Sequence, residues 1–274
     1  MVMRWVRAGI ATTILACGLP LHAPAQVYQM PSPVPRSTSA ADLHDAAIAR
    51  EIHERFSLGI AALSSENNAA AAAEFERILA LHPHEPQGST AHYDLALAYA
   101  QSGKLDDAAR ELHSAIDLDR GFLAAMANLI SIDLQRHDLT DARAVAERFV
   151  AVAPDSARAL YSRGIVALRS GDARTAASDF GQLIARNPQY AVAHYDLGVA
   201  EIQLGDNGRA EREFDTALEL APGYARARFA LGTVLLQSGR RAEARACFDR
   251  AAHDAGTDVA LVNLATSMRD AINP

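Results

Sequence analysis

The chain has 274 residues, of which half are apolar and 22% are charged. That balance is typical of a soluble globular protein and excludes a disordered chain or one that crosses a membrane several times. Two cysteines are too few for a disulfide framework. The formal charge of -7 provides no global basic field for a nucleic acid backbone, so we expect no nucleic acid partner.

Residues 1–25 have the pattern of an export signal. Arg4 and Arg7 form a positive region before an apolar stretch that is too short for a comfortable membrane span. Small residues at 23–25 then provide a signal-peptidase site, which predicts a mature start at Gln26. The expected localisation is therefore periplasmic or secreted.

The same segment has an alternative interpretation. The sequence Ile-Leu-Ala-Cys at 14–17 resembles the lipobox of bacterial lipoproteins, in which Cys17 is acylated and becomes the first mature residue. The chain would then be an outer-membrane lipoprotein. In the soluble interpretation the Pro- and Ser-rich stretch 26–39 predicts an extended tether, and the folded domain is expected over 40–274.

The rest of the chain repeats with a period of 34 residues. The pentapeptide Ala-His-Tyr-Asp-Leu occurs at 91–95 and again at 193–197, three periods later. Each unit is predicted to hold two helices, because a Gly or Asp marks a break in its middle and a Pro often marks its end. Such a helix pair cannot bury its apolar face alone, so neighbouring pairs are expected to stack. The units are placed at 52–85, 89–122, 123–156, 157–190, 191–224 and 225–258.

Two further helical segments flank these units. An apolar pattern without a breaker begins near Ala40, which predicts a first helix longer than those that follow. At the other end, residues 259–272 form one more amphipathic helix, which is expected to cap the last unit.

The units resemble the tetratricopeptide repeat family, here of an exported bacterial type. The family pattern has Leu-Gly, then Ala, Phe, Ala and Pro at fixed offsets. The fifth unit carries it as Leu197, Gly198, Ala210, Phe214, Ala217 and Pro222. The Gly is expected to let the two helices of a unit approach, and the Phe to fill the gap between them. The resemblance implies an all-α fold, a right-handed superhelical solenoid of six helix-turn-helix repeats with a C-terminal capping helix.

The resemblance also implies a concave groove, lined by the first helices, that holds a peptide or a partner helix. Aromatic side chains recur on these helices one position beyond the core, with polar side chains beside them, and we interpret both as partner contacts. The alternatives are burial between neighbouring helices for the rings and simple solvation for the polar groups. The predicted groove residues are Phe56, Tyr93, Asp94, Asn128, Tyr161, Ser162, Tyr195, Asp196 and Phe229.

Three residues depart from the family pattern at positions that are usually buried. Arg163 occupies the place of a Leu, while Asp133 and Glu201 occupy places where the family often has Tyr. Stacked first helices would place Arg163 between the two carboxylates, and a buried Arg is tolerated when it is paired. We therefore predict a structural ion network of these three residues, with ligand binding or solvent exposure as alternatives.

Catalytic signatures are absent from the sequence, which has no zinc-protease motif, phosphate loop or nucleophile elbow. We expect no enzyme activity, no cofactor and no small-molecule substrate. His82-Pro83-His84 is the sharpest metal candidate, but in a chain with ten His we interpret it as chance spacing and predict no metal site.

The expected function is that of an exported scaffold that binds a peptide or helix of an envelope protein. The alternative is a lipoprotein, acylated at Cys17, that helps a pilus secretin or another outer-membrane protein complex to assemble. Intact mass separates the two, since the mature chain starts at Gln26 in the first and at Cys17 in the second.

Overall fold

The computed structural model describes residues 40–272, which contain thirteen helices and no strand. The predicted signal over 1–25, the tether over 26–39 and Cys17 lie outside the described residues. The described residues belong to two compact units, an N-terminal unit over 40–153 and a C-terminal unit over 154–272. Each unit is described by itself.

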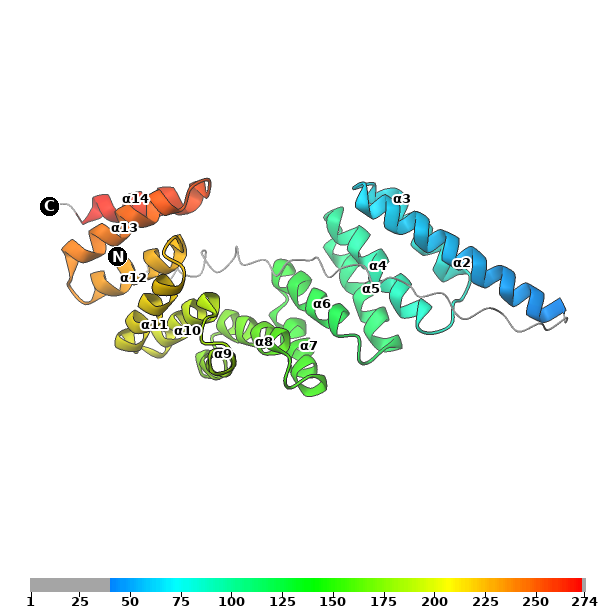
Figure 1. Ribbon diagram of the computed structural model, residues 1–274, viewed down its shortest axis with the longest axis horizontal. Coiled ribbons are helices and arrows are strands. Elements are labelled where there is room, and N and C mark those ends of the chain that lie inside the picture. The colour runs from blue at the N-terminus through cyan, green and yellow to red at the C-terminus, as the bar shows by residue number, and fades with distance from the viewer. Residues whose placement is uncertain (1–39, 273–274) are drawn as a thin grey trace. The chain divides into compact units, whose positions relative to one another are not determined.

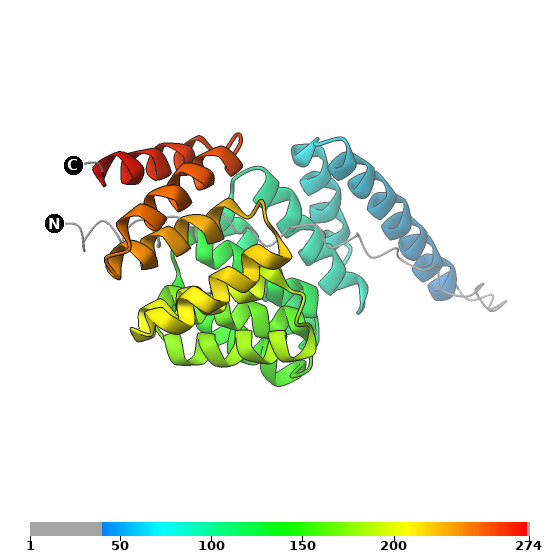
Figure 2. The ribbon, with the colours of Figure 1, turned by 60° about the vertical axis from the view of Figure 1, so that its left-hand side comes forward.

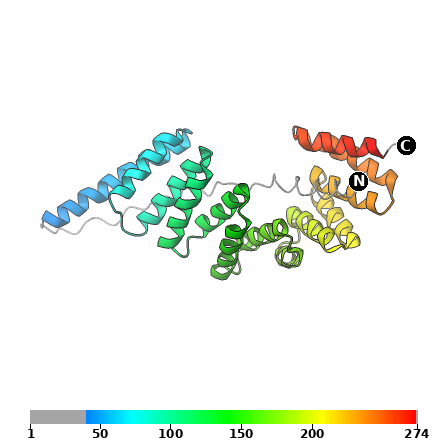
Figure 3. The ribbon, with the colours of Figure 1, turned by 180° about the vertical axis from the view of Figure 1, so that it is seen from behind.

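The N-terminal unit is a stack of three helix pairs (Figure 1). Consecutive helices pack against each other along the stack, as Figure 3 shows for α3, α4 and α5. The first helix starts at Ala40 and has 25 residues, so the prediction of a long first helix is confirmed. The helices are α2 (Ala40–Ser64), α3 (Asn68–Ala80), α4 (Gln87–Gln101), α5 (Leu105–Leu118), α6 (Leu123–Arg136) and α7 (Leu139–Val152).

The C-terminal unit continues the same alternation and ends with an additional helix. The helices are α8 (Ala157–Ser170), α9 (Ala173–Arg186), α10 (Ala191–Leu204), α11 (Asn207–Leu220), α12 (Ala225–Gln237), α13 (Arg241–Asp254) and α14 (Val259–Ala271). Helix α14 packs along α13 (Figures 1 and 2), which confirms a helix at the predicted place. It buries Leu261 and Ala265, while Asn263, Ser267 and Asp270 are exposed.

The turns inside the repeats follow from two residue types. Gly171 and Gly205 end their helices with φ of 79° and 85°, left-handed values that cost glycine no Cβ clash. The next residue is an Asp that caps the second helix. Asp172 accepts a hydrogen bond from Thr175 N at 3.2 Å, and Asp206 accepts one from Arg209 N at 2.9 Å. These turns set the antiparallel pairing of the two helices.

The core of a repeat depends on a close contact between a glycine and a phenylalanine. A Cβ atom at Gly198 would lie 2.6 Å from Phe214 Cε1, a distance that allows no methyl group without movement. The prediction that the Gly lets the helices approach and the Phe fills the gap is therefore confirmed. The same relation joins Gly59 to Phe75, Gly164 to Phe180 and Gly232 to Phe248.

The Leu that begins the family pattern differs in exposure between the first and the last repeat. Leu231 on α12 is 7% exposed, whereas its equivalent Leu58 on α2 is 58% exposed, and within residues 40–272 no helix precedes α2 to cover it. Residues around Leu58 line a shallow open pocket of about 430 Å³ on α2. Within residues 40–272, no helix is both long enough and apolar enough to span a membrane.

Candidate functional site

The aromatic row predicted as contact anchors is part of the core. Its five rings, on Phe56, Tyr93, Tyr161, Tyr195 and Phe229, are each 8% exposed or less. Four of them pack in tilted pairs against the Phe of the second helix, as in the pair Tyr195 and Phe214 with ring centroids 5.9 Å apart, and Tyr93 packs against Phe122, which precedes α6. This corrects the predicted role, because the rings fill the space between helices and present almost no surface to a partner.

The polar neighbours of these rings are buried as well. Asn128 Nδ2 on α6 donates a hydrogen bond to the Tyr93 hydroxyl on α4 at 3.0 Å. In the C-terminal unit the direction is reversed, and the Tyr161 hydroxyl on α8 donates a hydrogen bond to the Asp196 carboxylate on α10. A tyrosine of one repeat therefore bonds the polar residue of the next. Within each unit this bond ties one first helix to its neighbour.

Burial changes the ionisation of the acids in this register. It raises the pKa of Asp94 to about 7, and it raises the pKa of Asp196 to about 7 against the opposing effect of the Tyr161 hydroxyl. Asp196 Oδ2 and Ser162 Oγ are fully enclosed, and neither has a hydrogen-bond partner. Buried polar atoms normally have one. The first helices thus retain hydrogen-bonding capacity that the fold leaves unused.

The exposed part of the same face is a row of glutamines. Helix residues three and seven positions after a given residue lie on the same side of the helix as that residue. On each first helix, the residue that follows the buried ring and the residues three and seven positions after it therefore share one surface, which we call the first-helix face. Its seventh-position residues, which we call the glutamine row, are Gln101 on α4, Gln135 on α6, Gln203 on α10 and Gln237 on α12, with Arg169 in the same register on α8. All four glutamines are exposed.

The glutamine row was missed in the sequence analysis, although the signal is present. The four residues follow the 34-residue period, skipping only the unit that has Arg169. Each carboxamide offers two donors and an acceptor with two lone pairs, which match a peptide backbone. Between the buried polar residues and the glutamines lie small or apolar side chains, among them Leu97, Val199 and Thr233.

The predicted ion network has different partners in the structure. Arg163 on α8 binds Asp179 on α9 with two hydrogen bonds, Nε to Oδ2 at 2.8 Å and Nη2 to Oδ1 at 2.7 Å. Asp179 is fully buried. Glu201, the partner expected for Arg163 within the same unit, pairs with Arg209 at 3.3 Å. Arg163 is therefore paired, but with Asp179, which was not among the predicted partners, and the predicted contact with Asp133 stays a prediction.

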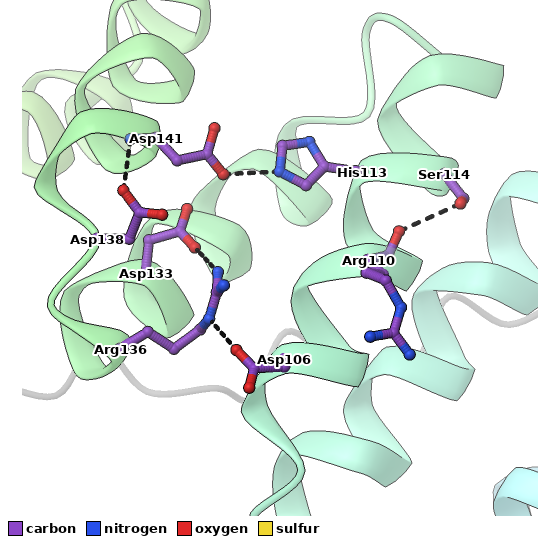
Figure 4. Close-up of polar contacts among 8 residues, drawn as sticks. All are labelled: Asp106, Arg110, His113, Ser114, Asp133, Arg136, Asp138 and Asp141. Atoms are coloured by element: carbon purple, nitrogen blue, oxygen red, sulfur yellow. Dashed lines mark hydrogen bonds and ion pairs between the residues drawn. The ribbon is translucent and has the colours of Figure 1, made fainter.

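Asp133, the third member of that network, belongs to a polar cluster in the N-terminal unit (Figure 4). Arg136 bridges Asp133 and Asp106 with two bonds of 2.8 Å. Burial and the neighbouring Asp141 carboxylate raise the pKa of Asp133 to about 7. Asp141 in turn contacts His113 Nε2 at 2.7 Å. The cluster joins α5, α6 and α7 and has a structural role.

The metal candidate lies in the connection between α3 and α4. His82 has a left-handed φ of 50° and is followed by Pro83 and His84. Throughout residues 40–272, no group of three or more His, Cys, Asp or Glu side chains is arranged to hold a metal ion.

A stack of 34-residue helix pairs with a recurring face on its first helices defines a helical-repeat protein. Family models described as tetratricopeptide repeat match residues 56–121, 128–191 and 195–259, and a second such model matches residues 167–218. The chain therefore belongs to the tetratricopeptide repeat family, whose members are protein-interaction scaffolds.

Solved structures share this fold at low sequence identity. A crystal structure of MamA has a TM-score of 0.55 and 23% identity, covering 63% of this chain and 94% of that chain. MamA from Desulfovibrio magneticus RS-1 has a TM-score of 0.57 and 17% identity, covering 62% and 97%. YrrB, described as a tetratricopeptide repeat protein with an unusual peptide-binding site, has a TM-score of 0.55 and 17% identity, covering 72% and 100%. No curated protein matches the chain in sequence.

Proposed function

We propose that this protein is an exported scaffold that binds an extended segment of an envelope protein on its first-helix face. The observation that carries the proposal is the glutamine row, which places two exposed carboxamides in one register on the first helices of each unit. An extended backbone has unpaired N–H and C=O groups along its length, and carboxamides at repeat spacing can satisfy both. Half-buried apolar side chains beside the row, such as Leu97, Ile202 and Leu236, supply contact area.

The peptide-binding site described for YrrB supports this proposal at the level of the fold. The face here differs from a site that reads a C-terminal carboxylate with several Lys and Arg side chains, because its repeated element is neutral. Neutral carboxamides favour recognition of a main chain over recognition of a terminal charge.

The test is a crosslinking pull-down from the envelope fraction of the native host with two double variants. Gln101→Ala/Gln135→Ala changes the N-terminal unit and Gln203→Ala/Gln237→Ala changes the C-terminal unit. All four side chains are exposed, but Gln203 Nε2 donates a hydrogen bond to the Leu168 carbonyl at 3.3 Å and Gln237 Oε1 accepts one from Asn207 Nδ2 at 3.2 Å. The melting temperature is therefore expected to stay close to that of the wild type for the first variant and to fall slightly for the second. We expect at least one of these variants to lose a dominant partner.

The matched control is Gln182→Ala/Gln189→Ala, which removes two exposed glutamines from outside the row. Gln182 lies on α9, a second helix, and Gln189 lies in the turn after it. The control is expected to keep every partner of the wild type. Unchanged partners in both row variants would show that the first-helix face is not the binding surface.

Export itself is part of the proposal and is supported by the leader sequence over 1–25. The alternative lipoprotein, acylated at Cys17, is an assembly factor for a secretin or another outer-membrane complex. Intact mass of the protein from its host decides between a chain that begins at Gln26 and one that begins at Cys17 with added acyl groups. A chain that keeps residues 1–25 without a lipid would contradict both.

A further inference from the structure

Asp94 is an unusual residue on the first-helix face of the N-terminal unit. It is 4% exposed, and no hydrogen bond or ion pair reaches its carboxylate from any described residue. Unlike Asp196 Oδ2, its oxygens are not fully enclosed. The carboxylate therefore lies at the floor of the face, within reach of a bound molecule and without an internal partner.

The missing partner has a cause in the sequence. In two later repeats a tyrosine of the preceding first helix bonds the polar residue, as Tyr93 does with Asn128 and Tyr161 does with Asp196. The residue before Asp94 in this series is Phe56, which has no hydroxyl. Phe56 therefore contributes a ring to the core and no donor to Asp94.

Two other aspartates whose side chains are almost fully covered are paired with arginines. Asp179 is held by Arg163, and Asp254 pairs with Arg228 and Arg250 at 3.2 and 2.9 Å. A buried carboxylate without such a partner is costly, and burial alone raises the pKa of Asp94 to about 7. A cation placed against it would recover that cost.

Two arginines of the N-terminal unit are each held by two carboxylates other than Asp94. Arg55 binds Glu51 and Glu74, while Arg136 bridges two aspartates. The residues 40–153 contain nine Lys and Arg against eighteen Asp and Glu, a formal charge of -9. The field of this unit therefore attracts a positive ligand from solution.

We propose that Asp94 binds the side chain of a Lys or Arg in the partner segment, which makes the N-terminal unit selective for basic sequences. The inference rests on the proposed function, because it assigns a side-chain preference to the same face. The glutamine row would hold the main chain of the segment, and Asp94 would select one residue in it.

The test is selection of short peptides from a random library, acetylated at the N-terminus so that Lys and Arg are the main cations offered. The full chain is compared with Asp94→Asn and with the matched control Asp196→Asn. Asp94→Asn is expected to fold, because Asn128 occupies the same register on the next first helix. We expect one enriched basic position with the wild type and with Asp196→Asn, and no such enrichment with Asp94→Asn.

A binding measurement on one selected peptide then tests the pairing directly. Replacing its basic residue by norleucine is expected to raise the dissociation constant about tenfold for the wild type and to leave it unchanged for Asp94→Asn. Peptides that bind without a basic position would overturn this inference and leave the proposed function intact. If a basic position persists in Asp94→Asn, the cation is bound elsewhere. Failure of every peptide to bind would count against the proposed function itself.

Discussion

The two units are built from the same repeat but carry very different charge. The N-terminal unit has a formal charge of -9, whereas residues 154–274 contain fourteen Lys and Arg against fifteen Asp and Glu, a charge of -1. Both units nevertheless use the same glycine-to-phenylalanine contact in their cores. The packing of a repeat and its electrostatics are therefore set by different positions, so one can vary while the other is kept.

The units also differ in how they treat buried acids. In the C-terminal unit Asp179 and Asp254 have arginine partners, and Asp196 has a tyrosine. In the N-terminal unit Asp94 has no partner among the described residues, and Asp133 is bonded by Arg136 at 2.8 Å but also lies beside the Asp141 carboxylate. A buried acid without a partner costs stability, and Asp94 is such an acid.

The largest expected effect comes from breaking the pair of Arg163 and Asp179 in the C-terminal unit. Arg163→Leu leaves the buried Asp179 carboxylate without its two hydrogen bonds, so the free energy of unfolding is expected to fall by about 3–5 kcal/mol. Urea unfolding measures this loss of free energy. The double variant Arg163→Leu/Asp179→Leu is expected to recover most of the loss. A loss below about 1 kcal/mol in the single variant would show that the pair contributes little.

The next prediction concerns pH and Asp94 in the N-terminal unit. Its pKa is about 7 in the folded chain and about 3.9 in the unfolded chain, so the folded chain binds the extra proton between these values. The free energy of unfolding therefore falls as pH rises from about 4 to 7, by up to about 1.4 kcal/mol per pH unit from this group.

Asp94→Asn is accordingly expected to weaken that pH dependence and to be about 3 kcal/mol more stable than the wild type at pH 8. Urea unfolding at pH 5, 6, 7 and 8 measures both effects. Asp196→Asn provides the comparison in the C-terminal unit, where the Tyr161 hydroxyl reduces the expected gain. Identical pH profiles of Asp94→Asn and the wild type would show that the carboxylate ionises normally.

A third prediction tests whether the two cores are equivalent. Gly59→Ala and Gly198→Ala each place a methyl group 2.6 Å from a buried Phe ring, and each is expected to cost about 2 kcal/mol of stability. The control is Gly181→Ala on α9, where a new Cβ meets no atom within 4 Å. That change is expected to stabilise the chain by up to about 1 kcal/mol. Thermal melts compare the three, and unequal losses at Gly59 and Gly198 would contradict equivalence.

The smallest expected effect concerns the uncovered end of the array. Leu58→Ala is expected to change the free energy of unfolding by less than about 0.5 kcal/mol, because its side chain is already 58% exposed. Leu231→Ala removes the equivalent side chain at 7% exposure and is expected to cost about 2–5 kcal/mol. Chemical unfolding of both variants measures the difference. A large loss at Leu58 would indicate that another segment covers it.

Most of the fold could be predicted from the sequence because the information is local and repeated. The period, the Gly and Asp of the turns and the Gly-to-Phe relation each depend on residues within one unit. The helix over 259–271 and the long first helix followed from periodicity alone. Repetition makes such signals strong, because independent units carry the same pattern.

The site was harder to predict because it depends on contacts between elements. The Tyr195 ring looks exposed from helical spacing, but Tyr224, the last residue of the same repeat and the one directly before α12, covers it with ring centroids 5.1 Å apart. Arg163 was compared only with other first helices, whereas its partner Asp179 lies on the second helix of its own repeat. The glutamine row was predictable, and it was missed because polar exposed residues carry no core signal.

The two ends of the array differ in a way that limits how the protein can change its length. At α2 the Leu58 side chain is 58% exposed, and at α14 the Val259 side chain is 66% exposed beside the exposed polar residues Asn263, Ser267 and Asp270. A helix pair inserted before α2 by gene duplication could bury Leu58, whereas one inserted after α14 would cover Val259 together with those polar side chains. Lengthening the array at its first repeat is therefore expected to need fewer compensating substitutions than lengthening it at α14.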